Sequence, residues 1–193
     1  MATEKDPTLI KAPEVLRKER LRIAVILCCS FARNLAYYRA WWGKDHQHFL
    51  ALANNHQIFW RAVNNNFFDI CILDWCKLFA DKRGKHGWRQ IVTDISKFEA
   101  ELLCHLGLDA ATFESEIKIM RSYRNQFVAH QDLKYTTMLP TLNVAKKAIW
   151  FYHAHIVNHE AQVGDLFGLT TDIERGYEEE EQGARAVYLG ISM

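Results

Sequence analysis

Apolar residues recur every three or four positions along most of the chain, which is the period of a helix that buries one face. Pro13 and Pro140 suit the first turn of a helix, and Gly107 suits the position after its last turn. The pattern predicts a first helix over about 13–42 and a second over about 46–80. A third covers about 88–106, with a candidate break at 93–94 after which Ser96 caps a fresh start. A fourth begins at a cap, Asp109 or Thr112, and reaches the segment 123–130, and a fifth covers about 141–160. The fold class that follows is all-α, an up-and-down helical bundle of about five helices.

Polarity divides the chain into two parts. We expect a helical bundle over residues 1–160 and a polar, acidic C-terminal extension over 161–193, packed on or trailing the same domain. The extension carries consecutive glutamates at 178–181, whose mutual repulsion favours a solvated helix or a loose tail. Between the second and third predicted helices, the loop 81–87 (DKRGKHG) gathers basic side chains.

The composition favours one domain and excludes a generally basic protein. With 193 residues, of which 49% are hydrophobic, the chain is long enough for one well-filled core. Its net charge of +1 gives no general attraction to nucleic acid. A local cluster of Arg and His is nevertheless enough to hold a phosphate.

Cysteine usage and hydropathy indicate a cytoplasmic protein. The five cysteines are an odd number without a C-x-x-C pair, and most have apolar neighbours, so we expect reduced core residues. The N-terminal residues lack the apolar centre of a signal peptide. The longest apolar run, 23–32, lies between Arg22 and Arg33 and is too short to span a bilayer. We therefore expect a soluble chain with no membrane partner.

Arg124 occupies a position where the helical pattern asks for an apolar residue. On a projection of about 100° per residue, Arg124 falls about 20° from Phe113. The apolar stripe on which it lies also includes Ile117, Met120, Phe127 and Val128. A guanidinium in such a stripe needs a partner, because Arg is almost never buried unpaired. Asp74, on the apolar stripe of the 46–80 helix, is the candidate counter-ion.

Two interpretations of this arginine follow. The first is a buried structural ion pair that fixes the register of two helices. The second is a phosphate site with an attached acid–base group: Arg124 supplies paired donors, and His130, at the end of the same helix, titrates near neutral pH. Tyr123 lies on the same side of the helix as His130 and is assigned a supporting role. The spacing leaves both interpretations open.

Arg124-Asn125, four further residues and then His130 is similar to the R-x(4–6)-H signature of the HEPN superfamily (higher eukaryotes and prokaryotes nucleotide-binding). Three flanking segments resemble the abortive-infection-associated bacterial branch of that superfamily: ILDWCKLF at 72–79, the His/Gly/Trp segment at 86–88 and MRSYRNQFVAHQD at 120–132. The likeness covers roughly residues 15 to 160.

The resemblance implies an HEPN-like bundle that pairs into a homodimer through its motif helices and needs no metal or other cofactor. Many members are metal-independent endoribonucleases of phage-defence or toxin–antitoxin systems, which implies RNA or a nucleotide as ligand and an antitoxin as a further partner. In that chemistry a ribose 2′-OH attacks the adjacent phosphate. His130 acts as general acid or base, Arg124 stabilises the developing charge, and Asn125 orients the His or the phosphate. Where some toxins carry a modified Tyr two positions after the His, this chain has Asp132.

Other polar residues extend or limit this picture. The candidate contacts to an RNA backbone are the basic-loop side chains Lys82, Arg83, Lys85 and His86. His155 and His159 lie one helical turn apart, but no further ligand set accompanies them in that helix, so no metal site is expected. Two other functions stay open: a non-catalytic nucleotide- or RNA-binding module, and a helical interaction protein in which Arg124 and Asp74 pair for structure alone.

Overall fold

A computed structural model describes residues 13–43, 46–53, 56–82, 84–128 and 139–190. In this part of the chain the α-helices are α1 (Pro13–Trp42), α2 (His46–Ala53), α3 (Gln57–Trp75), α4 (Ile95–Leu106), α5 (Ala110–Tyr123), α6 (Leu142–His155) and α7 (Ile173–Gly190). One short 3₁₀ turn, η4, covers Trp88–Gln90. Three helices end in a wider π-helical turn: η3 (Cys76–Ala80), η5 (Arg124–Val128) and η6 (Ile156–Glu160). The described residues contain no strand, so the all-α prediction is confirmed.

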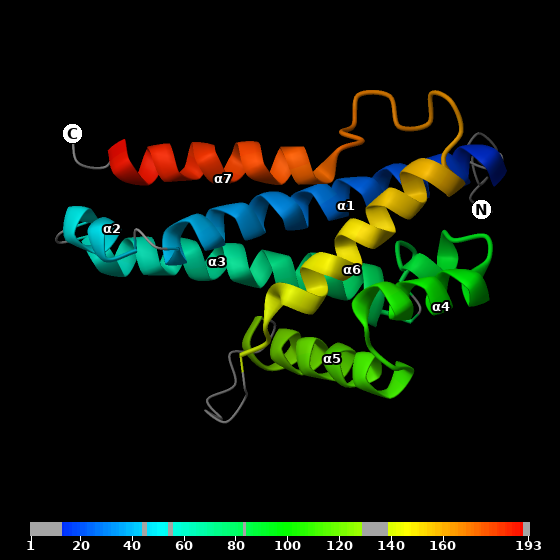
Figure 1. Cartoon of the computed structure of the whole chain (residues 1–193), viewed down its shortest axis with the longest axis horizontal. Coiled ribbons are helices and arrows are strands. Elements are labelled where there is room, and N and C mark those ends of the chain that lie inside the picture. The colour runs from blue at the N-terminus through cyan, green and yellow to red at the C-terminus, as the bar shows by residue number, and fades with distance from the viewer. Residues whose placement is uncertain (1–12, 44–45, 54–55, 83, 129–138, 191–193) are drawn as a thin grey trace, which may run out of the picture.

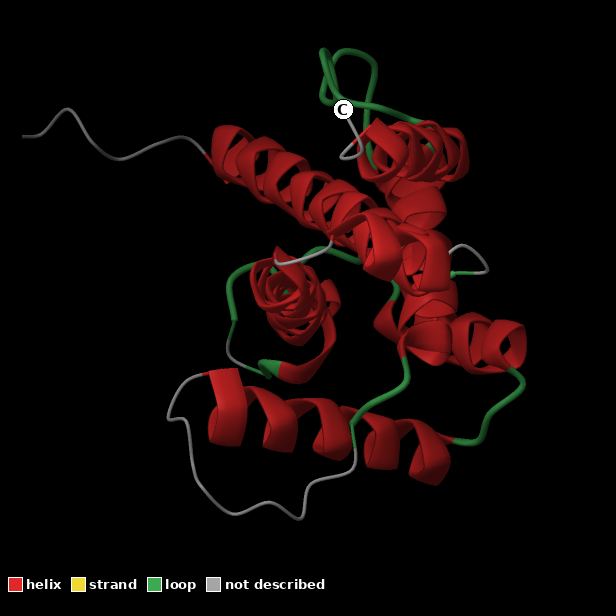
Figure 2. Cartoon of the chain, turned by 90° about the vertical axis from the view of Figure 1, so that its left-hand side faces the viewer, coloured by secondary structure: helices red, strands yellow, loops and turns green. Residues whose placement is uncertain are grey.

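The bundle is built around α1. Helices α3 and α7 lie lengthwise along α1, and α6 crosses it (Figure 1). Chain direction alternates, because α1 and α7 run one way and α3 and α6 run back. In Figure 2 the described elements are helices joined by loops, and α5 lies at the edge of the bundle. Burial of one face of each helix supplies the main driving force, with Phe31, Trp75, Phe98 and Tyr152 among the largest enclosed side chains.

Among the described helices, α1 is the one that is long and apolar enough to cross a membrane. In the bundle its inner face is enclosed by α3, α6 and α7, and residues such as Leu21, Val25, Phe31 and Leu35 are fully buried. An apolar helix at the centre of a packed bundle has the same composition as a membrane-spanning one. The packing of α1 is therefore compatible with a soluble protein.

Local signals in the sequence set several helix ends. The Asp109 carboxylate accepts a hydrogen bond of 2.7 Å from the Thr112 backbone N–H and so caps α5. Gly107 follows α4 with a φ of 66°, a left-handed conformation that costs glycine little. The expected break before α4 is present, but its cap is Asp94 rather than Ser96. The predicted bounds of α1 match the structure, Pro13–Trp42.

The predicted helix over 46–80 is wrong in two places. It is interrupted between α2 and α3, where the sequence carries the turn-forming pair Asn54 and Asn55. It also widens into the π turn η3 before it ends. Phe59, which the helical pattern places on the inner face, is exposed, because the buried face of α3 runs through Asn64, Phe68, Cys71 and Trp75 instead.

The C-terminal extension forms α7, which packs along α1. Its acidic run is held by partners within the bundle: the Tyr37 hydroxyl donates to Glu180 over 2.6 Å, and Arg33 lies 3.4 Å from the same carboxylate. Glu181 pairs with Arg185 one turn later. The acidic segment is thus a helix of the bundle rather than a loose tail.

The five cysteines are all free thiols, as expected for a reduced protein. Cys28, Cys71 and Cys76 are buried and Cys29 is half-buried. Cys104 is exposed on α4, so its placement among core residues was wrong.

Candidate functional site

The arginine of the apolar stripe lies where α5 gives way to η5. Phe113, Ile117 and Met120 on the same stripe are buried, whereas Phe127 and Val128, within η5, are only half-buried. A π turn carries more residues per turn than an α-helix, so the stripe begins to leave the core at this point. The side chain of Arg124 is accordingly 21% exposed rather than enclosed.

The counter-ion of Arg124 is Asp81, not Asp74. Nη1 of Arg124 donates to Oδ1 of Asp81 over 2.6 Å. Asp74 is 3% exposed and accepts a 3.0 Å hydrogen bond from Lys77. Asp74 precedes η3 and is buried, as its place on the apolar stripe predicted, but its partner is Lys77, three residues later, rather than Arg124. The π turn η3 ends directly before Asp81, which places that carboxylate beside the end of α5.

The Asp81 carboxylate both neutralises and orients the guanidinium. Partial burial acts to lower the pKa of Arg124, but the hydrogen bond to Asp81 and the electrostatic effects of Cys76 and Asp81 together outweigh burial and raise that pKa above its ordinary value. Nε of Arg124 donates to Oδ1 of the exposed Asn125 over 3.2 Å. Arg124 therefore stays charged and has two of its donors fixed by neighbouring side chains.

Arg124 lines an open depression on the surface. The depression has a volume of about 590 Å³ and is lined by Ala80, Asp81, Lys82, Gly84, Arg121 and Arg124. Arg121 donates to the backbone carbonyl of Ala80, the last residue of η3. The lining thus holds three cationic side chains and one carboxylate. Because that carboxylate already pairs with Arg124, the depression is suited to an anion.

The glycine that lines the depression belongs to a tight turn. The backbone N–H of Gly84 donates to the carbonyl of Asp81 over 2.8 Å. A Cβ at Gly84 would lie 3.0 Å from that same carbonyl oxygen, closer than most real contacts. The turn holds the backbone close to Asp81 and leaves the side chain of Lys82 exposed at the rim.

The other basic-loop residues are distributed differently. Lys85 is exposed, and His86 is half-buried; neither lines the depression. Burial and, after it, the nearby charges of Arg20 and Lys85 lower the pKa of His86, so it is mostly neutral at pH 7. Arg83 lies outside the described residues, as does His130, the expected acid–base group.

Tyr123 points away from the depression, into the bundle. Its hydroxyl donates to Asp69 over 2.9 Å, and its ring packs between Phe68 and Phe127. Burial and the bond to Asp69 raise the pKa of Tyr123, so it remains a neutral donor. It supports the site by fixing the end of α5 on α3.

Cys76, at the start of η3, is a thiol that interacts electrostatically with Arg124. Burial raises its pKa to about 11, even though the charge of Arg124 acts in the opposite direction. A thiol with that pKa is almost entirely protonated at neutral pH and is a poor nucleophile. It packs the site rather than reacting there.

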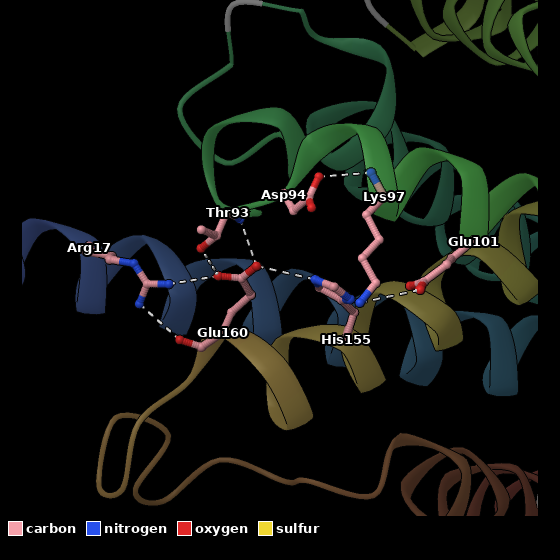
Figure 3. Close-up of polar contacts among 7 residues, drawn as sticks. All are labelled: Arg17, Thr93, Asp94, Lys97, Glu101, His155 and Glu160. Atoms are coloured by element: carbon pink, nitrogen blue, oxygen red, sulfur yellow. Dashed lines mark hydrogen bonds and ion pairs between the residues drawn. The ribbon is translucent and has the colours of Figure 1, made fainter.

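His155, on α6, belongs to a separate polar cluster around Glu160 (Figure 3). The buried Glu160 carboxylate accepts from the Thr93 backbone N–H at 2.8 Å, from the Thr93 hydroxyl at 2.7 Å and from Arg17 at 2.8 Å. His155 lies 3.3 Å from it, and the ring of His159 lies 5.0 Å from that of His155, tilted by 48°. This cluster joins α1, α6 and the segment before α4. The described residues include no group of three or more potential metal ligands.

Two residues of the depression escaped the sequence analysis. Arg121 precedes Arg124 by three positions and therefore lies on the same side of α5, a spacing that was available as a signal. Asp81 is the only acidic residue of the basic loop, which was interpreted through its positive charges alone.

No protein-family model, curated protein or solved structure matches this chain.

Proposed function

We propose that this protein is a cytoplasmic, metal-independent endoribonuclease whose site includes the depression beside Arg124. The observation that carries the proposal is the position of Arg124: it is charged, partly exposed and held by Asp81 at the wall of an open depression that contains two further cations. A purely structural arginine would be enclosed with its partner. An arginine held at the edge of a cationic depression is available to a phosphate.

In the proposed reaction the 2′-hydroxyl of a ribose attacks the neighbouring phosphorus. The 2′-oxygen–phosphorus bond forms and the bond from phosphorus to the next 5′-oxygen breaks, which yields a 2′,3′-cyclic phosphate and a 5′-hydroxyl. His130 accepts or donates a proton, and Arg124 stabilises the charge on the phosphoryl oxygens. Asn125, next to Arg124 and exposed, orients the phosphate or the histidine.

The arrangement of partners follows the resemblance to the HEPN superfamily. Two copies would pair through their α5 ends, so that two motifs share one cleft. A nuclease of this kind acts in phage defence or as the toxin of a toxin–antitoxin pair, with an antitoxin as a further partner. The exposure of Asn125 at the end of α5 is consistent with a surface that a second copy covers.

The test is cleavage of mixed RNA by purified protein in EDTA, with wild type compared with His130→Ala. We expect wild type to produce fragments with 2′,3′-cyclic phosphate ends and His130→Ala to produce none. Lys118→Ala, on the solvent face of α5, is the matched control and should cleave as wild type does. Circular dichroism and sizing establish that each variant is folded.

Two outcomes would contradict the nuclease proposal. Cleavage that persists in His130→Ala would remove the assigned acid–base group. A folded, dimeric wild type that binds RNA without cutting it would instead identify a non-catalytic RNA-binding module.

A further inference from the structure

The charge balance of the depression exceeds what one phosphate needs. Lys82, Arg121 and Arg124 line it, and Asp81 is its one carboxylate. Asp81 lies against Arg124, whereas Arg121 has a neutral carbonyl, that of Ala80, as its partner. Within the described residues Lys82 contacts no carboxylate at all. The lining has a net charge of +2, so a single phosphodiester, with one negative charge, would leave a net charge of +1.

The positions of these cations separate them along the surface. Arg121 lies three residues before Arg124, which corresponds to about 4.5 Å along the helix axis. Its bond to Ala80 fixes the guanidinium against the end of η3, two residues before Lys82, which also lines the depression. The volume of about 590 Å³ falls in the range, roughly 300–1,000 Å³, of sites for ligands larger than a single phosphate.

The lining favours contacts to a backbone over stacking of bases. Its six described residues include no aromatic ring on which a base would stack, and Arg124 and Arg121 already direct donors at Asp81 and at the carbonyl of Ala80. Contacts to phosphates position a nucleic acid without carrying sequence information. The depression is therefore built for a backbone.

We propose that Lys82 and Arg121 form a second phosphate subsite beside Arg124, so that the depression holds two successive phosphates of a single RNA strand irrespective of its sequence. The proposal rests on the proposed function, because it takes RNA as the ligand. It adds Arg121 to the binding residues and assigns Lys82 to a phosphate that is not the one being cleaved.

The test measures binding without cleavage. A fluorescent twelve-nucleotide RNA with every 2′-hydroxyl methylated cannot be cut by the proposed reaction, and its affinity is measured by anisotropy over a range of salt concentrations. Loss of one phosphate contact reduces the slope of log K against log salt by about 0.7 for a single strand. We expect that reduction for Lys82→Gln, none for the exposed control Lys118→Gln, and recovery with Lys82→Arg.

Chemical modification of the RNA, combined with the mutation, identifies the phosphate that Lys82 contacts. Uncharged methylphosphonate linkages replace the phosphates of the same RNA one at a time. We expect one of these replacements to weaken binding to wild type and to have no further effect in Lys82→Gln. Arg121→Gln, checked for folding because its side chain holds Ala80, should show the same loss. Homopolymers of U and of A should bind equally well.

The outcomes separate this proposal from the nuclease. An unchanged slope in Lys82→Gln, with wild type binding RNA normally, would overturn the second subsite and leave the proposed cleavage intact. Strong preference for one homopolymer would overturn the backbone-only subsite. Absence of any RNA binding by wild type would remove both proposals. The expected slopes in a protein that cuts no RNA would support the subsite and contradict the nuclease.

Discussion

The strength of the ion pair between Arg124 and Asp81 distinguishes a ligand-binding arginine, whose pair is weak, from a structural one, whose pair is strong. The perturbation is a double-mutant cycle of Arg124→Gln, Asp81→Asn and the combined variant, which removes the charges and keeps most of each side-chain stem. Hydrogen bonds to charged groups contribute about 1.5–3 kcal/mol when enclosed, and exposed ion pairs about 0.2–1 kcal/mol. Arg124 is 21% exposed and Asp81 is 35% exposed, so the pair falls between these cases. We expect a coupling energy of about 1 kcal/mol.

The assay is equilibrium unfolding in urea, monitored by circular dichroism, for wild type and the three variants. Each single substitution should lower the free energy of unfolding by about 1–1.5 kcal/mol, and the double variant should lie close to either single one. The matched control is the exposed pair Lys97–Glu101, 3.9 Å apart on α4, which should show no measurable coupling. A cost above about 3 kcal/mol for Arg124→Gln is typical of an enclosed pair that has lost one partner, and it would refute the view of Arg124 as accessible.

Two further outcomes follow from other parts of the fold. Glu160→Gln loses charge-assisted bonds from Thr93, so we expect it to lower the free energy of unfolding by about 3 kcal/mol, against less than about 0.5 kcal/mol for the exposed Glu101→Gln. Burial acts to raise the pKa of Glu160, but hydrogen bonding from Thr93 lowers it below the ordinary 4.5. The charged carboxylate therefore stabilises the fold above pH 4.5, and this stabilisation is lost on further acidification. In urea unfolding from pH 7 to pH 3, the difference in unfolding free energy between wild type and Glu160→Gln should shrink. The exposed thiol Cys104 should react with a maleimide in the native protein, whereas Cys28, whose pKa burial raises well above its ordinary value, should react only after unfolding; equal labelling of the two by mass spectrometry would contradict the burial of α1.

Much of the fold is encoded in local signals, and those parts are predictable from the sequence. The apolar period and the glycine at position 107 act within a few residues and are predicted directly, and Asp109 is one of the two caps, Asp109 or Thr112, that the sequence offers for α5. The π turns are different, because the choice between an α and a π turn depends on what each end packs against. Extrapolating a constant angle through η3 therefore missed Asp81, whereas Asp74, which precedes η3, is buried as predicted but pairs with Lys77.

The anomaly at Arg124 was correctly located, but its partner and its depth were not. The apolar stripe of α5 is real, since Phe113, Ile117 and Met120 are buried. A helical projection shows an apolar stripe as continuous, but it does not show where the helix ends and the stripe leaves the core. Arg121 and Asp81 become part of the site only because the ends of α3 and α5 meet, which is a tertiary fact.

The strength of the Arg124–Asp81 pair also sets what the site can do. Binding of a phosphate requires at least some of the Arg124 donors now directed at Asp81. If phosphate binding breaks the Arg124–Asp81 pair, a coupling energy of about 1 kcal/mol is lost, which reduces phosphate affinity about fivefold, since 1.4 kcal/mol corresponds to a factor of ten. A coupling of about 4 kcal/mol would reduce it nearly a thousandfold, and few surface phosphate contacts overcome that cost. A weak pair keeps the guanidinium charged and oriented until a stronger anion replaces the carboxylate, whereas a strong pair leaves it a structural element.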